Sequence, residues 1–277
     1  MCSTCGCGNH NGPDRAKNNR LIHAELEVGA AQRLAPDGWQ PPLTTEQQSA
    51  QSETSLYAHN RQLAMDLRLR LSAKRVLLLN LVSSPGAGKT TLLVETLGRL
   101  PPGCKAYVIE GDQQTDLDAE RIRATGTAAV QINTGQACHL EAERVGQALR
   151  QLQPESDSLV FVENVGNLIC PAHFDLGEGQ RVVLLSVTEG DDKPLKYPDI
   201  FASADLVVIT KSDLLPYVDF NLAHCRANIE KINPNLEVIT SACGRSIDLS
   251  RWLHWLTERA QEFQQENRHD RPAYTAT

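Results

Sequence analysis

The chain has 277 residues, 41% of them hydrophobic, and a formal net charge of -7 at pH 7. This size allows one substantial core with extensions, and the acidic balance argues against nucleic acid as a partner. No apolar run reaches the roughly 18 residues of a membrane-spanning helix, and the polar, cysteine-rich beginning does not resemble a signal peptide. We therefore expect a soluble, cytoplasmic protein without a membrane partner, whose eight cysteines remain thiols.

The chain begins with a cysteine-rich motif at 1–8, MCSTCGCG. Cys2, Cys5 and Cys7 are three soft ligands, and the chain's own amino group can supply a fourth. Such a set suits Ni²⁺ or Zn²⁺, whereas the alternative is a disordered tail with unrelated thiols. Residues 9–54 are polar with few clustered apolar residues, which predicts a flexible linker.

An amphipathic helix is predicted to lead from this linker into the core. Leu56, Leu63, Leu67 and Leu71 can share one helical face. Ser55 precedes them and is a suitable N-cap.

From Val76 onward, short apolar runs rich in β-branched residues alternate with longer helical patterns. Within these runs apolar and polar residues do not alternate strictly, as expected for strands buried on both faces of a parallel sheet. They are VLLLNLV, AYVIE, AAVQI, SLVFVE, RVVLLSV, DLVVIT and LEVIT, and the predicted helices cover 89–100, 139–153, 219–232 and 248–266. This order predicts a doubly wound α/β domain with a mainly parallel sheet of about seven strands. We place the domain at 55–266 and a disordered tail at 267–277.

The segment SSPGAGKT, from Ser83 to Thr90, joins the first predicted strand to a helix that starts near Lys89. This context is that of a phosphate-binding P-loop, although Ser83 replaces the usual first glycine; the alternative is a glycine-containing turn without a ligand. Lys89 is expected to neutralise the β and γ phosphates, and the Thr90 hydroxyl to bind Mg²⁺. The expected nucleotide contacts are Gly86, Ala87, Gly88, Lys89, Thr90 and Thr91.

Acidic residues end two further strands, at the edge where open α/β sheets bind ligands. Asp112 is a second candidate for the Mg²⁺ shell or the attacking water, or else a helix cap. Glu163 is expected to hold Mg²⁺ or its water, and Gly166 to bring a backbone amide to the γ-phosphate. This pattern resembles the acid-x-x-Gly of GTPases. Because Asn167 stands where small GTPases often place a water-orienting Gln, we expect slow hydrolysis.

The segment Thr210-Lys211-Ser212-Asp213 follows another strand and predicts the choice of base. The Asp213 carboxylate can accept hydrogen bonds from the ring N–H and exocyclic amine of guanine, which adenine cannot offer there. The Lys211 stem can pack over the base, and Ser241 and Ala242 are candidates for a further backbone contact. The substrate is therefore predicted to be GTP rather than ATP.

A second group of metal ligands is separated along the chain. Cys138 and His139 are predicted to open a helix, and Cys170 follows Gly166 closely. If these segments meet at the sheet edge, they provide two thiolates and one imidazole, which a two-fold dimer could complete. The alternative is that all three are structural. Cys104, Cys225 and Cys243 have no nearby ligands and are interpreted as structural.

Taken together, MCSTCGCG, SSPGAGKTT, EGDQQTDLDAERIRATG, ACHLEA, ENVGNLICP, DDKPLKYP and TKSD resemble the hydrogenase nickel-incorporation GTPases, the HypB family within the SIMIBI class. The resemblance covers the N-terminal motif and nearly all of the core. It implies a GTPase whose GTP-dependent homodimer delivers nickel to the large subunit of [NiFe]-hydrogenase together with the metallochaperone HypA.

The resemblance also implies a tight nickel site at Cys2, Cys5 and Cys7 and a second nickel or zinc site at Cys138, His139 and Cys170. Lys193, Lys196 and Tyr197 are candidates for contacts with a partner subunit. Three other functions remain open: a urease-type nickel accessory GTPase, a nickel-binding or storage protein with incidental GTPase activity, and a partitioning-type ATPase.

Overall fold

The computed structural model describes residues 45–112, 117–135, 137–242 and 249–268. The chain divides into two compact units, Met1–Ser49 and Ala50–Thr277, and the following description concerns the second. The described residues do not include the motif with Cys2, Cys5 and Cys7, most of the predicted linker, Cys243, or residues 269–277 of the predicted tail. Among the helices of the described part, none combines the length and apolarity needed to cross a membrane.

Seven parallel strands form one sheet in the order β3-β2-β4-β1-β5-β6-β7. All seven apolar runs identified in the sequence are strands, so the predicted fold class is confirmed. The strands are β1 Leu77–Ser83, β2 Ala106–Asp112, β3 Ala128–Asn133, β4 Leu159–Glu163, β5 Gln180–Ser186, β6 Leu206–Thr210 and β7 Glu237–Thr240. The chain reverses its winding direction around β1, and this switch point opens the crevice where such sheets bind ligands.

The helices include the four predicted after Val76, with slightly shorter bounds, and the predicted leading helix. They are α2 Thr45–Lys74, α3 Lys89–Leu97, α4 Leu117–Arg123, α5 Ala142–Leu152, α6 Cys170–His173, α7 Lys193–Lys196, α8 Pro198–Ala202, the 3-10 helix η1 Ser212–Tyr217, α9 Leu222–Ile232 and α10 Ser250–Glu266. The prediction for the start of the leading helix is wrong. It begins at Thr45, so Ser55 lies within it rather than capping it, and residues 45–54 of the predicted linker are helical.

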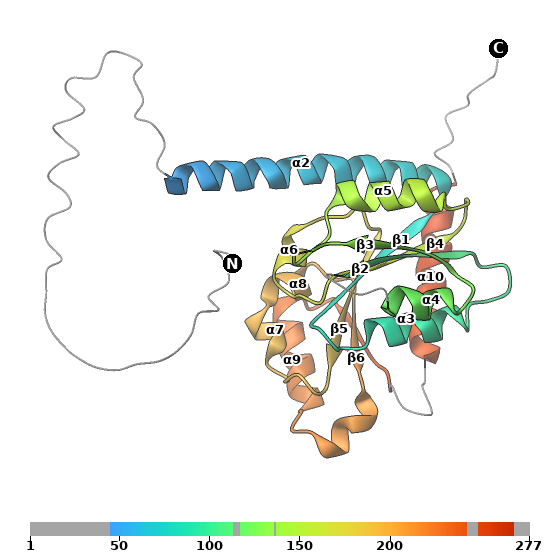
Figure 1. Ribbon diagram of the computed structural model, residues 1–277. Helices are drawn as coiled ribbons and strands as arrows, with labels where there is room; N and C mark the ends of the chain where they lie inside the picture. Colours follow the sequence, from blue (N-terminus) through green and yellow to red (C-terminus); the bar gives the residue numbers. More distant parts are fainter. Residues whose placement is uncertain (1–44, 113–116, 136, 243–248, 269–277) are drawn as a thin grey trace, which may run out of the picture. The chain divides into compact units, whose positions relative to one another are not determined.

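Helices cover both faces of the sheet because alternate residues of its strands point in opposite directions. On one face, Leu77, Leu79 and Leu81 of β1 share a core cluster with residues of α3, α4 and α10. On the other face, Leu78 packs with α2 and α5, and Val82 packs with α8 and α9. Figure 1 shows α2 and α5 together on one side of the sheet. The β1 strand is buried along its whole length, as a strand covered on both faces should be.

Helix α2 packs closely against the second face. Gly177, with φ of +78°, lies so near α2 that a Cβ there would come within 2.7 Å of the Ala64 carbonyl oxygen. Gly146 of α5 lies under Leu67, whose Cδ2 would be 3.3 Å from an added Cβ. An ion pair of 2.7 Å joins Arg68 to Asp175, in the segment after α6. The part of α2 that carries Ala64, Leu67 and Arg68 therefore belongs to the packed core of the second unit.

Candidate functional site

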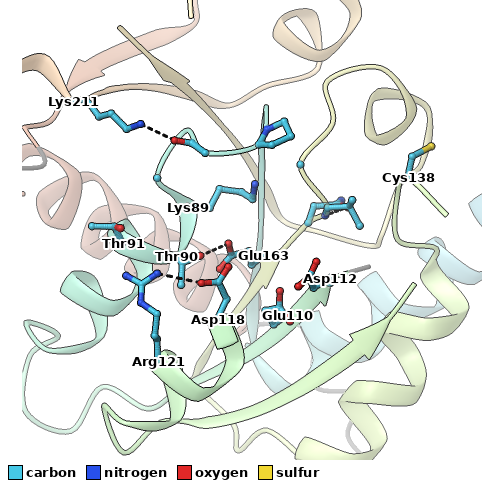
Figure 2. Close-up of a pocket in the computed structure, with 17 residues that line it drawn as sticks. Lys89, Thr90, Thr91, Glu110, Asp112, Asp118, Arg121, Cys138, Glu163 and Lys211 are labelled. Atoms are coloured by element: carbon cyan, nitrogen blue, oxygen red, sulfur yellow. Dashed lines mark hydrogen bonds and ion pairs between the residues drawn. The ribbon is translucent and has the colours of Figure 1, made fainter. Parts of the chain in front are cut away.

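A cavity of about 540 Å³ lies at the carboxyl ends of β1, β2 and β4. Figure 2 shows its charged side chains gathered around the start of α3, with Cys138 to one side. The lining residues are Pro85, Gly86, Gly88, Lys89, Thr90, Thr91, Glu110, Gly111, Asp112, Asp118, Arg121, Cys138, Glu163, Asn164, Val165, Gly166 and Lys211. The fold thus brings most of the predicted nucleotide contacts into one cavity.

The predicted P-loop has the backbone that phosphate binding requires. Gly86 and Gly88 have φ values of +74° and +102°, a region that side-chain-bearing residues rarely adopt. Lys89 is buried, and its ammonium donates a 2.9 Å hydrogen bond to the hydroxyl of Ser83. Burial lowers the pKa of Lys89, while the carboxylate of Glu163 opposes that shift. Ser83, which replaces the usual glycine, is therefore a hydrogen-bond partner of the lysine rather than an obstacle to it.

Thr90 and Glu163, the two residues predicted to hold Mg²⁺, contact each other. The Thr90 hydroxyl donates a 2.7 Å hydrogen bond to Glu163 Oε1, and both side chains are buried. The other carboxylate oxygen, Oε2, is buried with no hydrogen-bond partner among the described residues. Burial raises the pKa of Glu163 to about 7, although Lys89 and Thr90 act in the opposite direction. The Thr90 hydroxyl and the unsatisfied Oε2 of the neighbouring Glu163 carboxyl group are hard oxygen donors, which are the ligands that Mg²⁺ prefers.

Asp112 ends β2 and lines the same cavity. Helix α4 is described from Leu117 onward, and residues 113–116 lie outside the described part of the chain, so the helix-cap interpretation of Asp112 stays a prediction. Its place at the strand end agrees with a position near a metal or water, which was one of the two interpretations of the sequence. Gly166 is also close to the P-loop: a Cβ there would lie 2.9 Å from both Cα and Cγ of Pro85.

Of the residues predicted to recognise the base, Lys211 contacts the P-loop directly. Lys211 Nζ donates a 2.7 Å hydrogen bond to the Gly86 carbonyl, and the buried Thr210 hydroxyl donates one of 2.7 Å to the Ala87 carbonyl. The Ser212 amide donates to the Ser241 carbonyl at 3.1 Å. Asp213 is exposed at the start of η1, and neither it nor Ser241 and Ala242 belong to the lining of the cavity.

Cys138, His139 and Cys170 converge in space. One ligand atom from each lies within 4.8 Å of the others, and the two sulfur atoms are 2.7 Å apart. His139 stacks on Phe174 with ring centroids 3.7 Å apart, and burial lowers the pKa of His139, which favours the neutral imidazole that binds metals. We call these three residues the thiol–imidazole cluster. Contrary to prediction, Cys138 and His139 lie in a bend before α5 instead of opening it, whereas Cys170 begins α6.

The thiol–imidazole cluster is joined to the cavity through short contacts. Cys138 itself lines the cavity. The Asn167 side-chain amide donates a 3.3 Å hydrogen bond to the Cys138 carbonyl, and its oxygen accepts one from the Ile169 amide. Asn167 is not among the lining residues, so the position compared with a water-orienting Gln instead links the two cysteine-bearing segments.

Comparison with known proteins decides the family. The family model described as CobW/HypB/UreG, nucleotide-binding domain, matches residues 77–240. Hydrogenase maturation factor HypB of Escherichia coli (strain K12) is 42% identical over 285 residues, covering 92% of this chain and 98% of the relative. HypB of Azotobacter chroococcum mcd 1 is 50% identical over 215 residues, covering 78% of this chain and 70% of the relative. The chain belongs to the HypB family of hydrogenase maturation factors.

Solved HypB structures have the same fold. HypB from Helicobacter pylori in complex with nickel matches with a TM-score of 0.69 and 38% identity, over 74% of this chain and 96% of that one. HypB from Archaeoglobus fulgidus matches with the same TM-score and 37% identity, over 73% of this chain and 99% of that one. The resemblance to the HypB family, inferred from short motifs, is therefore confirmed.

Several residues that line the cavity were not predicted from the sequence, among them the polar residues Asp118, Arg121 and Asn164. Asp118 and Arg121 on α4 form a 3.1 Å ion pair at its wall. Their i,i+3 spacing on a helix that follows a strand end at the ligand-binding edge could have indicated a site, but surface ion pairs with this spacing are common. Asn164 is buried, and its oxygen accepts a 3.3 Å hydrogen bond from the Leu140 amide, just beyond His139. That contact has no local sequence signature.

Proposed function

We propose that this chain is a cytoplasmic GTPase that carries nickel to [NiFe]-hydrogenase during maturation. The observation that carries the proposal is the position of Cys138, which lines the nucleotide cavity and lies 2.7 Å from Cys170. A nucleotide-dependent change in this wall would move a metal ligand, so nucleotide state and nickel affinity would be reciprocally coupled. Membership of the HypB family and the nickel named for the H. pylori relative support the nature of the cargo.

The reaction assigned to the cavity is hydrolysis of GTP to GDP and phosphate. The P-loop amides and Lys89 would bind the phosphates, Thr90 and Glu163 would hold Mg²⁺, and Asp112 would take part in the metal shell or orient water. Bound Mg²⁺ supplies charge neutralisation of the β and γ phosphates. Asp213 would select guanine, with Lys211 packing over the base and Ser241 and Ala242 near it. Gly166 would bring its amide to the γ-phosphate.

Nickel is the cargo, and two sites are proposed for it. Cys2, Cys5 and Cys7 at 1–8 would form the tight site, connected to the GTPase domain by the linker region. The thiol–imidazole cluster offers three soft ligands to Ni²⁺ or Zn²⁺, one fewer than a closed tetrahedral site. A GTP-dependent homodimer could complete or share it. The proposed partners are HypA and the large subunit of [NiFe]-hydrogenase.

One titration tests the coupling. Ni²⁺ is added to protein loaded with GDP and to protein loaded with a nonhydrolysable GTP analogue, and the affinity of the second site is measured together with oligomeric mass. The affinities are expected to differ because the cluster shares a wall with the nucleotide. Equal affinities in the two states would contradict the coupling.

The alternatives predict different results. Lys89→Ala is expected to abolish hydrogenase maturation; if maturation survived it but failed after loss of Cys2, Cys5 and Cys7, nickel storage would be the function. Displacement of GTP by an equal concentration of ATP would favour a partitioning-type ATPase. Restoration of urease rather than hydrogenase activity in cells lacking the corresponding factor would favour the urease accessory role.

A further inference from the structure

Helix α2 contacts both segments that carry the thiol–imidazole cluster, through a single side chain. Asn60 is 5% exposed. Its oxygen accepts a 2.8 Å hydrogen bond from the Ala142 amide, and its side-chain nitrogen donates one of 2.8 Å to the Asp175 carbonyl. Ala142 follows closely after His139, and Asp175 follows closely after Cys170. One amide group thus bridges the two ligand-bearing segments from a third element.

The partners determine why this residue is asparagine. The backbone amide of Ala142 can only donate, and the carbonyl of Asp175 can only accept. A side chain that serves both must present an acceptor and a donor at its end, which a carboxylate or an aliphatic group of similar size cannot do. The orientation of the Asn60 amide follows from the same two partners.

The amide of Ala142 is one of the unpaired donors at the start of α5. A helix leaves its first amides without intrahelical partners, and a neighbouring side chain usually satisfies one of them. The N-cap residue of α5, Glu141, makes no such side-chain hydrogen bond. Asn60 fills this role from another helix, so the start of α5 is held by α2.

Aromatic contacts connect the same helix to the cluster. Tyr57 lies one turn before Asn60, and its ring centroid is 5.2 Å from that of Phe174, which in turn stacks on His139. Arg68 adds its ion pair to Asp175. These contacts all reach the segment after Cys170, and Phe174 of that segment also stacks on His139. The position of α2 therefore affects both sides of the cluster.

We propose that Asn60 is a positioning residue for the thiol–imidazole cluster, holding the segment with Cys138 and His139 at binding distance from the segment with Cys170. The inference rests on the proposed function of that cluster as a metal site. Asn60 does not touch the metal ligands; it fixes the backbone on either side of them. Replacing residues that hydrogen-bond directly to metal ligands typically changes metal affinity by about 10- to 100-fold, and we expect an effect within this range for Asn60, which holds the backbone next to the ligands.

The test uses the full-length chain with Cys2, Cys5 and Cys7 changed to Ser, so that only the second site binds. Ni²⁺ affinity is measured by competition with a chelator in the GDP state, and the thiolate-to-nickel charge-transfer absorption reports the ligand set. Two substitutions are compared. Asn60→Leu removes both hydrogen bonds and keeps the number and branching of the side-chain heavy atoms. Asn60→Asp keeps an acceptor for the Ala142 amide and removes the donor to Asp175.

A matched control is Thr96→Val, which removes a buried hydrogen bond in the opposite layer, where Trp252 Nε1 donates to Thr96 Oγ1 at 2.8 Å. It tests whether loss of stability alone weakens metal binding, and thermal unfolding is recorded for every variant. GDP affinity should stay unchanged in the Asn60 variants, because Asn60 does not line the nucleotide cavity.

Both Asn60 variants are expected to bind Ni²⁺ about 10- to 100-fold more weakly and to lose charge-transfer intensity, while Thr96→Val binds normally. If Asn60→Leu weakened Ni²⁺ binding but Asn60→Asp did not, Asn60 would act only as a cap for α5, and the proposed bridge between the two segments would be refuted. Equal weakening by Thr96→Val would also overturn it. If Cys138→Ser and Cys170→Ser leave Ni²⁺ binding unchanged, the proposed metal site itself fails, an outcome distinct from failure of Asn60 alone.

Discussion

Replacing Gly166 by alanine tests how tightly the loop after β4 is packed on the P-loop. The added Cβ would lie 2.9 Å from Cα and Cγ of Pro85 and 3.0 Å from its nitrogen. Carbon atoms in ordinary contact are about 3.5 to 4.0 Å apart, so one of the two loops must move by roughly half an ångström. Two of the three obstructing atoms belong to the backbone, which cannot rotate away. The backbone of Gly166 is not left-handed, so the steric effect acts alone.

Overpacking of this kind costs about 1 to 3 kcal/mol of unfolding free energy. For a domain of this size each kcal/mol lowers the melting temperature by about 2 to 4 °C. Displacement of the P-loop also disturbs Lys89 and Thr90, and we expect the GTP hydrolysis rate to fall by about tenfold or more, since a shift of about 1 Å can cost 100-fold. Thermal unfolding and single-turnover hydrolysis measure the two effects.

Gly98→Ala is the matched control. A Cβ at this helix end would be 3.6 Å from the Val94 carbonyl oxygen, an ordinary contact, and the residue has a right-handed φ of -70°. Its stability should remain the same or rise by about 0.4 to 1 kcal/mol. If Gly166→Ala unfolded at the parental temperature and hydrolysed GTP at the parental rate, the close packing of this loop on Pro85 would be refuted.

Buried groups elsewhere in the domain support three further predictions. Thr210→Val removes the hydroxyl that donates a 2.7 Å hydrogen bond to the Ala87 carbonyl, so the affinities for GTP and GDP, measured by nucleotide titration, should both fall. Thr210→Ser keeps the hydroxyl and should keep both affinities. Glu178→Leu leaves the buried guanidinium of Arg181, whose Nη2 lies 2.6 Å from Glu178, without its ionic partner. We expect the free energy of unfolding, measured by chemical denaturation, to fall by about 3 to 5 kcal/mol. If the effects of Glu178→Leu and Arg181→Met simply added in the double variant, the two residues would not be coupled. Burial raises the pKa of Cys225 to about 12, so iodoacetamide at pH 8 should leave this thiol unmodified in the native protein. Peptide mass spectrometry measures the modification, and rapid labelling of Cys225 would contradict the prediction.

The strands and the P-loop were predictable because their signals are local. The predicted run VLLLNLV is apolar on both faces, and that property distinguishes a central parallel strand from a surface strand. Gly86 and Gly88 stand between a strand and a helix, so the phosphate loop is encoded within a few residues. The short helices α6, α7 and α8 were missed because so few residues carry no periodicity.

The sequence by itself determined which side chains have the chemistry suited to phosphate, magnesium or nickel, since that chemistry belongs to the residue types. Only the tertiary structure decided which of them meet. Cys138 and Cys170 are 32 positions apart, and Asn60 reaches across 82 positions to Ala142 and 115 to Asp175. Contacts at such separations follow from the order of the strands and the packing of α2 on α5. The sequence left open whether Cys138, His139 and Cys170 form a metal site or are structural residues. Their proximity, on which that choice depends, is visible only in the tertiary structure, because the sheet brings their two segments to the same edge.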